Sequence, residues 1–455
     1  EGSLIPETEA SKLLTAAVCY RKTSNARLYL AVFTVTLGNF SFGYSIVYSS
    51  PALKQLNETS NPRLHLDDTN KSWFASSYTL GAAFGGFMAI LLNNCLGRKT
   101  IILVSIVPCV AGFALMAAAQ AIWMLDFGRT LTGIAGGISV MYVSEISTVE
   151  VRGKLGAGAQ IMTVIGSFLL YLLGELSWRW LAGLGLIAPV VMFVLLLFMP
   201  ESPRYLISAN QNEKAIRALV WLRGPDCPNQ AEDSKVSCAD LKQPGIYKPV
   251  LMVVIMWALQ QLSGITVILL YMELIFSQTQ SGNADSPIVG VVRLLAVLVT
   301  SWLLDRTGRR KLLFASGTDA ISLSLNKNEP RSTHAHIYIL SLCSPGSDHV
   351  SLSLSRSLAG YSLGWGPITW LMTSELLPIR VRGQVSGLCV LFSWILSFLI
   401  ANQFLAAQVS LSLCVHFRPF TPSLVFTALF IPETMGLTLE EIEEYFQPIS
   451  TTRQA

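Results

Sequence analysis

Apolar stretches long enough to cross a membrane recur along this chain, and short polar segments separate them. A helix needs roughly 20 mostly apolar residues to cross about 30 Å of hydrocarbon. The pattern predicts spans at 28–50, 73–92, 100–120, 121–143, 156–176, 180–199, 248–276, 288–304 and 384–407, with weaker candidates at 361–377 and 409–431. Six regular spans therefore fill the first half, and the second half is less regular.

Composition agrees with a membrane protein and excludes several other classes. Hydrophobic residues make up 52% of the 455 positions and charged residues 13%, which is far from the balance of a soluble domain. The formal charge of +4 is dispersed, without a basic run interleaved with aromatic residues, so we expect no nucleic-acid partner. No phosphate-binding loop, metal-ligand cluster or nucleophile elbow is present, so we expect no enzyme, no cofactor and no metal site.

Basic residues collect in every second connection between the predicted spans. Arg98-Lys99, Arg152, the segment 306–311 and Arg380 mark these connections, which the positive-inside rule places in the cytosol. The first alternate connection carries Asn57-Glu58-Thr59, a glycosylation sequon, which predicts that Asn57 lies on the opposite side.

This topology predicts five parts. They are a cytosolic N-terminal segment (1–27), an N-terminal six-helix bundle (28–199), a cytosolic central loop (200–247), a C-terminal helical bundle (248–431) and a cytosolic tail (432–455). The tail alternates charged and apolar residues at helical spacing over 439–446, which predicts a short helix.

Motifs of the first half return in the second half in the same order. Gly97-Arg98-Lys99 is answered by Gly308-Arg309-Arg310, and Pro200-Glu201-Ser202 by Pro432-Glu433-Thr434. The segment 144–153 is similarly answered by 374–383. Two homologous bundles with parallel repeats are typical of transporters whose halves tilt around a site near the membrane midplane.

The repeated charges predict an ionic latch at the cytosolic mouth. Glu145 and Arg152 are seven residues apart, about two helical turns, so both can face the partner half. The alternative is that they are charges at helix ends that reach out to the interface. We assign a gating role to Arg98, Arg129, Glu145, Arg152, Arg309, Glu375 and Arg382.

Three further motifs carry a family resemblance. They are Gly128-Arg129-Thr130-Leu131-Thr132-Gly133, Gln260-Gln261-Leu262-Ser263-Gly264 and Gly364-Trp365-Gly366-Pro367-Ile368. With them the chain resembles the facilitative hexose transporters, in the sugar-porter branch of the major facilitator superfamily. The resemblance implies an all-α polytopic membrane protein with two six-helix halves and nominally 12 transmembrane helices, of which helices 9, 10 and 12 are irregular here.

Distances counted along the helices predict a substrate site halfway through the membrane. Gln260, Arg293, Trp370 and Ser393 each lie 10–12 residues from a cytosolic charge marker, or roughly 15–18 Å. Amide groups and indole rings suit the hydroxyls and apolar face of a neutral polyol. The resemblance implies hexose contacts at Gln160, Gln260, Gln261, Trp370 and Trp394, whereas Thr266, Arg293, Ser362 and Ser393 replace other residues of the family pattern.

Arg293 is the most unusual residue of this predicted site. An ionisable group this deep usually faces a polar cavity or an ion partner, so it is expected to contact substrate or to raise the preference for an anionic solute. The alternative is that its side chain extends outward to the nearer membrane surface.

The expected function is facilitated transport, or uniport, of a hexose or related small polyol by alternating access. Proton-coupled members of the sugar-porter group carry an Asp after Phe-Gly-Tyr, where this chain has Ser45, so symport is the alternative, with Asp126 as its candidate carboxylate. Charged residues within 317–357 and 409–431 leave open a transport-deficient sensor or interaction protein.

Glu9 followed by Leu13-Leu14 forms an acidic dileucine pattern of the kind that sorting adaptors bind. It predicts a multi-pass protein of the endosomal or lysosomal membrane, with the plasma membrane as the alternative. The expected partners are a small neutral sugar, membrane lipid and a sorting adaptor.

Overall fold

A computed structural model describes the helical part of the chain and leaves several connections outside it. The described residues are 26–59, 61, 63–146, 152–202, 205–206, 211, 213–215, 217–218, 244–278, 285–324, 347–377, 382–405, 420–435 and 439–446. Within these ranges the regular structure is all helical. Six stretches there are long and apolar enough to cross a membrane: Asp68–Leu92, Arg98–Ala117, Trp178–Leu197, Ile246–Ser277, Asp285–Leu304 and Val385–Gln403.

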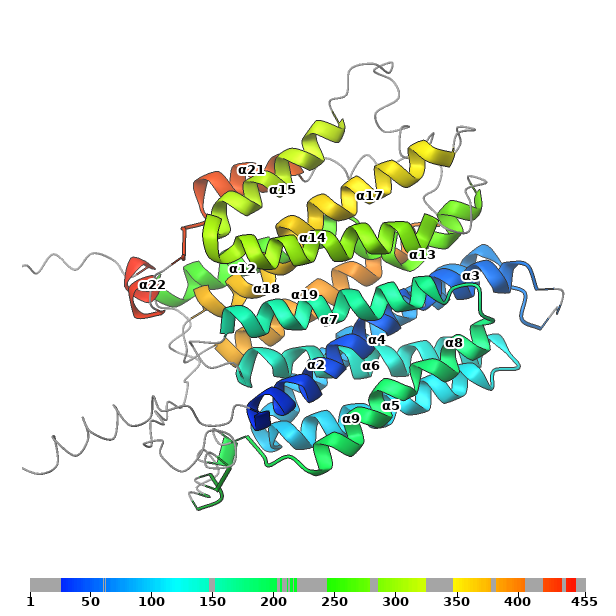
Figure 1. The fold of residues 1–455 in the computed structure, drawn as a ribbon, viewed down its shortest axis with the longest axis horizontal. Coiled ribbons are helices and arrows are strands. Elements are labelled where there is room, and N and C mark those ends of the chain that lie inside the picture. Colours follow the sequence, from blue (N-terminus) through cyan, green and yellow to red (C-terminus); the bar gives the residue numbers. More distant parts are fainter. Residues whose placement is uncertain are drawn as a thin grey trace, which may run out of the picture.

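The N-terminal bundle occupies the lower part of Figure 1. Its first span bends at Tyr48 and its sixth bends at Leu186, so each is formed by two helices in sequence. The α4 helix packs along α6, α5 packs on the other side of α6, and α2 packs along α7. The helices are α2 (Ala26–Val47), α3 (Ser49–Asn57), α4 (Asp68–Cys95), α5 (Arg98–Ala117), α6 (Ile122–Ile146), α7 (Arg152–Leu172), α8 (Trp178–Gly185) and α9 (Ile187–Leu197).

The C-terminal bundle lies above it, with α7 of the first bundle alongside α14 of the second (Figure 1). The second pair of neighbours across the interface is α4 and α19, and the third is α3 and α13. The helices are α12 (Pro244–Leu262), α13 (Ile265–Gln278), α14 (Asp285–Thr307), α15 (Arg309–Ser324), α17 (Ser347–Leu363), α18 (Trp365–Leu376), α19 (Arg382–Gln403), α21 (Phe420–Leu429) and the tail helix α22 (Leu439–Phe446).

The seventh span breaks at Gly264, between α12 and α13. Gly264 has a φ of 75°, a conformation that costs a residue with a side chain about 1–2 kcal/mol. Its N–H donates to the Gln261 carbonyl at 3.0 Å, and the Ser263 hydroxyl donates to the Gln260 carbonyl at 2.6 Å. The break therefore falls directly after the glutamine pair and fixes the backbone of both residues.

The ninth helix, α15 (Arg309–Ser324), is irregular, as predicted from the sequence, and it is not among the stretches that are apolar enough to cross a membrane. The Ser316 hydroxyl on this helix donates to the Gly360 carbonyl on α17 at 2.6 Å, and Gly317 lies against Leu424 of α21. A hydrogen bond to a neighbouring helix satisfies a polar residue that lowers the hydropathy of its own helix.

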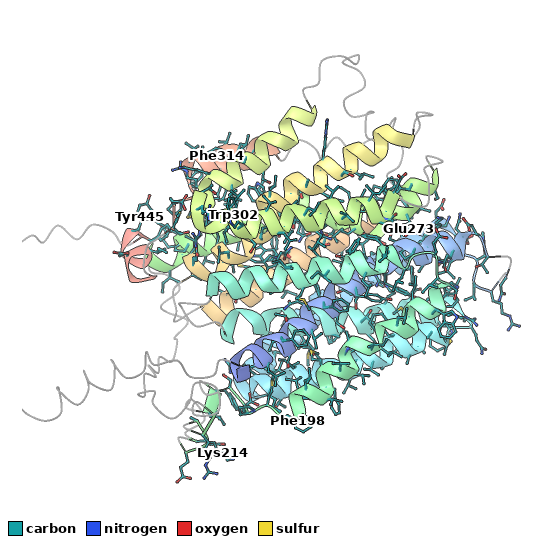
Figure 2. All side chains as sticks on the ribbon, viewed as in Figure 1. Phe198, Lys214, Glu273, Trp302, Phe314 and Tyr445 are labelled. Carbon is teal, nitrogen blue, oxygen red and sulfur yellow. The ribbon has the colours of Figure 1, made fainter. Side chains whose placement is uncertain are left out.

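Exposure follows the rule for a protein in lipid. Large apolar side chains point outward, including Phe84, Val107 and Phe198, which are 55%, 68% and 74% exposed. Figure 2 shows Phe198 at the outer edge of the N-terminal bundle, and Trp302 on α14 is 58% exposed. Polar residues such as Thr369 and Ser393 are buried instead. The bundles thus enclose hydrogen-bonding groups and present apolar groups to their surroundings.

Candidate functional site

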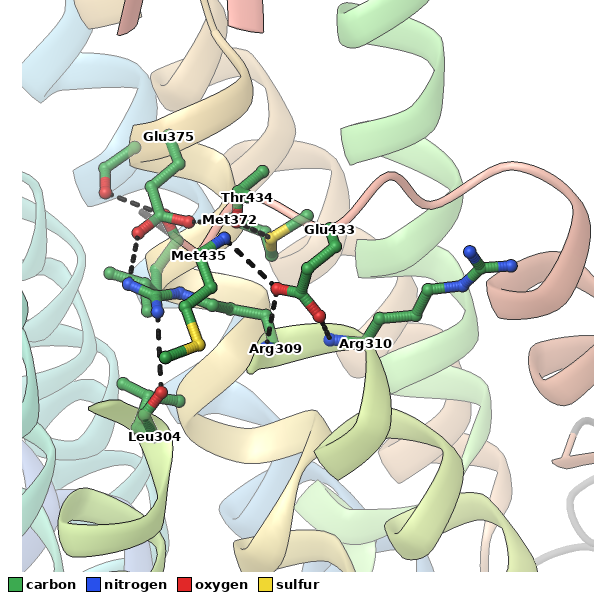
Figure 3. Close-up of polar contacts among 10 residues, drawn as sticks. Leu304, Arg309, Arg310, Met372, Glu375, Glu433, Thr434 and Met435 are labelled. Atoms are coloured by element: carbon green, nitrogen blue, oxygen red, sulfur yellow. Dashed lines mark hydrogen bonds and ion pairs between the residues drawn. The ribbon is translucent and has the colours of Figure 1, made fainter. Parts of the chain in front are cut away.

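One end of the molecule carries the repeated basic motifs, and we call it the basic end, defined by Arg98, Lys99, Arg309 and Arg310. In the C-terminal bundle the Arg309 guanidinium forms an ion pair with Glu375 at 3.1 Å, and the Thr434 hydroxyl donates to the same carboxylate at 2.6 Å (Figure 3). Glu433 accepts from the backbone N–H groups of Arg309 and Arg310 at 2.9 and 3.1 Å. A carboxylate at a helix N-terminus satisfies free N–H groups and favours the helix dipole.

The N-terminal bundle repeats this contact. Glu201 accepts from the backbone N–H of Lys99 at 2.8 Å, and the Lys99 ammonium donates to the Met199 carbonyl at 2.6 Å. A Cβ at Gly97 would meet the Glu201 carboxylate, and one at Gly308 would meet that of Glu433. Each glycine therefore lies directly against the carboxylate of its own bundle, and the sequence repeat corresponds to a repeated contact.

The predicted gating residues are only partly described. The Arg98 guanidinium lies 5.8 Å from the centroid of the Tyr205 ring, and Arg309 and Glu375 form the ion pair above. Glu145 lies in the last turn of α6, and Arg152 and Arg382 begin α7 and α19. The side chains of these three lie outside the described residues, so the latch stays a prediction.

Arg129 lies apart from the other predicted gating residues. It is fully buried near the start of α6, toward the end of the molecule away from the basic end. Its guanidinium donates to the carbonyls of Ser45 and Ile46 at the end of α2. The centroids of Tyr78, Phe74 and Tyr48 lie 4.7, 5.7 and 5.8 Å from its Cζ, so aromatic faces surround the charge.

The two glutamines form the centre of the predicted substrate site. Gln260, 2% exposed, donates from Nε2 to the Tyr361 hydroxyl and to the Trp365 carbonyl, both at 2.9 Å. The Gln261 amide oxygen accepts from the Thr266 hydroxyl at 2.9 Å, and its Nε2 lies 3.5 Å from the Ser393 hydroxyl. The structure thus joins α12 to α17, α18, α13 and α19 through these two amides.

The predicted tryptophans border this region in two places. Trp370 packs edge to face with Trp257 at 4.5 Å between centroids, and the Trp257 indole donates to Thr373 at 3.1 Å. Trp394 contacts Phe42 and Tyr78 of the other bundle, with centroids 5.8 and 6.3 Å away. The indole nitrogen of Trp394 is buried without a described partner, which leaves a donor for a ligand or water.

Gln160 and Arg293 complete the predicted set. Gln160 is half-buried on α7 and takes no part in the hydrogen bonds that hold Gln260 and Gln261. Arg293 is 5% exposed on α14 and donates to the Ser167 hydroxyl of α7 at 3.2 Å, across the interface between the bundles. This side chain therefore points to the other half of the protein, and the outward alternative is wrong.

The bundles are joined by hydrogen bonds toward the end opposite the basic end. The Ser49 hydroxyl donates to the Leu270 carbonyl at 3.0 Å, and the Glu273 N–H donates to the Ser50 hydroxyl at 2.9 Å. The Tyr171 hydroxyl also donates to the Leu269 carbonyl at 3.2 Å. All three bonds reach one turn of α13, so this turn closes the interface at the opposite end.

A family model described as "Sugar (and other) transporter" matches residues 31–446, nearly the whole chain. The chain belongs to this sugar transporter family. It is 44% identical to facilitated glucose transporter member 6 of Mus musculus, over 93% of this chain and 92% of that protein. It is 38% identical to member 8 of Bos taurus, over 92% and 95%, and 32% identical to a facilitated trehalose transporter of Culex quinquefasciatus, over 91% and 84%.

Solved structures of the same fold agree with this membership. The proton:xylose symporter XylE bound to 6-bromo-6-deoxy-D-glucose aligns with a TM-score of 0.74 at 21% identity, over 93% of this chain and all of that one. The predicted major facilitator fold and the predicted resemblance to facilitative hexose transporters are therefore confirmed. The proteins of this sugar transporter family are membrane transporters and not enzymes.

Several residues of the site were not predicted from the sequence. Tyr361 and Trp365 hold Gln260, Ser167 holds Arg293, and Tyr78 contacts Trp394. Trp365 belongs to a quoted motif, but no sequence feature indicated that its backbone carbonyl accepts from Gln260. Ser167 had no signal either, because a serine within an apolar span is common and its partner lies 126 positions away.

Two predictions lie outside the core of the transporter. Asn57 is exposed at the last turn of α3, at the end opposite the basic end, and its glycosylation stays a prediction. Glu9, Leu13 and Leu14 lie outside the described residues, so the sorting prediction remains as it was. Among the described residues, no group of three His, Cys, Asp or Glu side chains is arranged to hold a metal ion.

Proposed function

We propose that this sugar transporter moves a hexose or related small polyol by facilitated uniport, through alternating access of its two bundles. The observation that carries the proposal is the pair of buried amides, Gln260 and Gln261, held in fixed orientation by hydrogen bonds to Tyr361 and Thr266. Amides offer donors and acceptors to several hydroxyls without adding charge. The relatives named glucose and trehalose transporters support a sugar as the solute.

Alternating access requires contacts that break at one end while the other end closes. The described hydrogen bonds between the bundles join Ser49, Ser50, Ser76, Tyr171 and Ser167 to the C-terminal half, and all lie away from the basic end. With the basic end in the cytosol, this arrangement is closed to the non-cytosolic side. The termini are then cytosolic, Asn57 is available for glycosylation on the opposite side, and the dileucine of 13–14 is available to an adaptor for endosomal or lysosomal sorting.

Two features bear on coupling to protons. Ser45 follows Phe42-Gly43-Tyr44, so a hydroxyl stands where proton-coupled members of the sugar-porter group carry a titrating carboxylate. The backbone carbonyl of Ser45 accepts a hydrogen bond from Arg129. Asp126 is half-buried on α6, has one carboxylate oxygen without a described partner, and forms no described ion pair with Arg129. Uniport is the proposed mode, and Asp126 is the residue to test for the alternative of symport.

The proposal is tested with the purified full chain in liposomes, by uptake of radiolabelled D-glucose with the pH matched or opposed across the membrane. We expect saturable uptake that does not depend on the pH gradient. A dependence on the pH gradient that disappears in Asp126→Asn would establish symport instead.

The amide pair is tested in the same assay. Gln260→Leu removes the donors to Tyr361 and Trp365, and we expect uptake to fall at least about tenfold, the effect of losing a buried polar contact to a solute hydroxyl. Gln403→Leu, an exposed glutamine at the end of α19, is the matched control and is expected to retain uptake. Binding of sugar without flux in the unaltered protein would favour a sensor over a transporter.

A further inference from the structure

Arg293 is a buried cation in the middle of the transport region. It lies on α14, 5% exposed, and its one described hydrogen bond runs from a terminal guanidinium nitrogen to the Ser167 hydroxyl at 3.2 Å. Its Nε is buried without a described partner. A guanidinium offers five N–H donors, so most of the capacity of this group is unused by the protein.

The described part of the chain provides no counter-ion for this charge. The ion pairs there join Lys71 to Asp68, Arg217 to Glu213 and Arg309 to Glu375, and none includes Arg293. The side chains on which its charge acts are the phenols of Tyr171 and Tyr361. Removing a charge from water costs several kcal/mol unless a partner compensates, and deep ionisable groups in membrane proteins therefore mark binding sites.

Glu273 is a buried carboxylate on α13, and it belongs to a different site. It lines a cavity of about 240 Å³ at the end opposite the basic end, together with Lys54, Glu58 and Glu175. The charges that act most on Glu273 are those of Lys54 and Glu175, and no described ion pair joins Glu273 to Arg293.

The helix that carries the arginine packs against the helix that carries Tyr361, since α14 and α17 are neighbours. Arg293 interacts electrostatically with the Tyr361 phenol, whose hydroxyl accepts from Gln260 at 2.9 Å. Tyr361 therefore connects the guanidinium to the amide that is proposed to meet the hydroxyls of the solute. Guanidinium and carboxylate groups match in shape and form paired, charge-assisted hydrogen bonds.

We propose that Arg293 binds an acidic group of the transported solute, so that the central site prefers a sugar acid, a polyol carrying a carboxylate, over a neutral hexose. The inference rests on the proposed transport of a polyol at Gln260 and Gln261. Binding of the carboxylate compensates the buried charge, and the polyol supplies the hydroxyls for the amides. Arg293 is then the residue that determines specificity between anionic and neutral sugars.

The test compares D-glucuronate with D-glucose as radiolabelled solutes for the full chain in liposomes. We expect a ratio of kcat/KM of about tenfold or more in favour of glucuronate, as expected for one charge-assisted hydrogen bond. An imposed membrane potential that is positive inside is expected to increase glucuronate uptake, because a net negative charge crosses, and to leave glucose uptake unchanged. Acetate, a carboxylate without hydroxyls, is expected to compete poorly.

Variants separate the charge from the shape of the side chain. Arg293→Gln is expected to reduce the ratio of kcat/KM for glucuronate over glucose to about one, and Arg293→Lys to retain part of the preference. Arg179→Gln, an exposed arginine that donates to the Ala119 carbonyl, is the matched control and is expected to change neither solute.

The outcomes distinguish this inference from the proposed function. Equal uptake of both solutes, glucose uptake alone, or an undiminished preference in Arg293→Gln would overturn the inference and leave polyol transport standing. Absence of uptake for both solutes, in protein whose folding is verified by thermal unfolding, would overturn both.

Discussion

Two arginines are buried in the part of this membrane protein that the structure describes, and their surroundings differ. Arg129 lies within one bundle, where the carbonyls of Ser45 and Ile46 and three aromatic rings surround its guanidinium. Arg293 lies at the interface between the bundles, where the described residues give it one hydroxyl. Both are largely inaccessible to water, at 0% and 5% exposed.

The difference follows from whether each arginine lies inside one bundle or at the interface between the two bundles. A bundle that tilts as a rigid body keeps its internal contacts, so it can satisfy a buried charge permanently with its own groups. An interface that opens and closes cannot do so without holding the two halves together. We infer that the first arginine stabilises the N-terminal bundle and that the second is left for a ligand.

The strongest test of this comparison is Arg129→Met. The substitution keeps an apolar stem but removes the cation from the three rings and the guanidinium donor from the carbonyls of Ser45 and Ile46. We expect a loss of about 3 kcal/mol or more, from the desolvated cation–π contacts and the charged hydrogen bonds. Thermal unfolding in detergent, followed by intrinsic fluorescence, measures it. A thermal midpoint like that of the unaltered protein would remove the stabilising role.

Arg293→Met, unlike Arg129→Met, is expected to leave the stability of the protein unchanged or to raise it. Replacing an uncompensated buried charge by an apolar side chain of similar length is often neutral or stabilising, here by about 1 kcal/mol or more. The same unfolding assay without solute is expected to give an equal or higher midpoint. A clear loss of stability would mean that the protein itself compensates Arg293, and would weaken the contrast with Arg129.

Ser167→Ala tests how the hydrogen bond between Ser167 and Arg293 affects binding of a solute at the interface between the bundles. The serine is the one described hydrogen-bond partner of Arg293, so its removal leaves the guanidinium free for a solute. A hydrogen bond of about 1 kcal/mol corresponds to roughly a fivefold change in affinity, and we expect glucuronate to bind up to that much more tightly. The shift in thermal midpoint with glucuronate concentration measures the change. Weaker binding would indicate that Ser167 orients the guanidinium for the solute.

The smallest effect is expected for Tyr78→Phe. The ring that lies 4.7 Å from Arg129 is kept, and only a hydroxyl without a described partner is removed. We expect a change in stability of about 0.5 kcal/mol or less, as for substitutions that break no contact. A larger loss in the unfolding assay would show that the hydroxyl, and not the ring, holds Arg129.

Much of the architecture was predictable from local patterns. Apolar runs located the regular spans because the hydrocarbon thickness sets their length, and the repeated glycine and acidic motifs predicted the two equivalent halves. The ninth helix, α15, is irregular as predicted, but its packing was not predictable. Ser316 and neighbouring polar residues lower hydropathy there, and the bond to the Gly360 carbonyl that satisfies Ser316 depends on a helix distant in sequence.

The sequence by itself determined that this chain is a sugar transporter of two homologous bundles, and it placed Gln260, Arg293 and Ser393 at similar depths. Only the tertiary structure decided that Tyr361 holds Gln260, that Arg129 is enclosed within one bundle, and that Arg293 reaches Ser167 of the other. The physical reason is that depth is counted along a single helix, whereas contacts depend on the rotation of each helix about its axis and on the approach of the two halves.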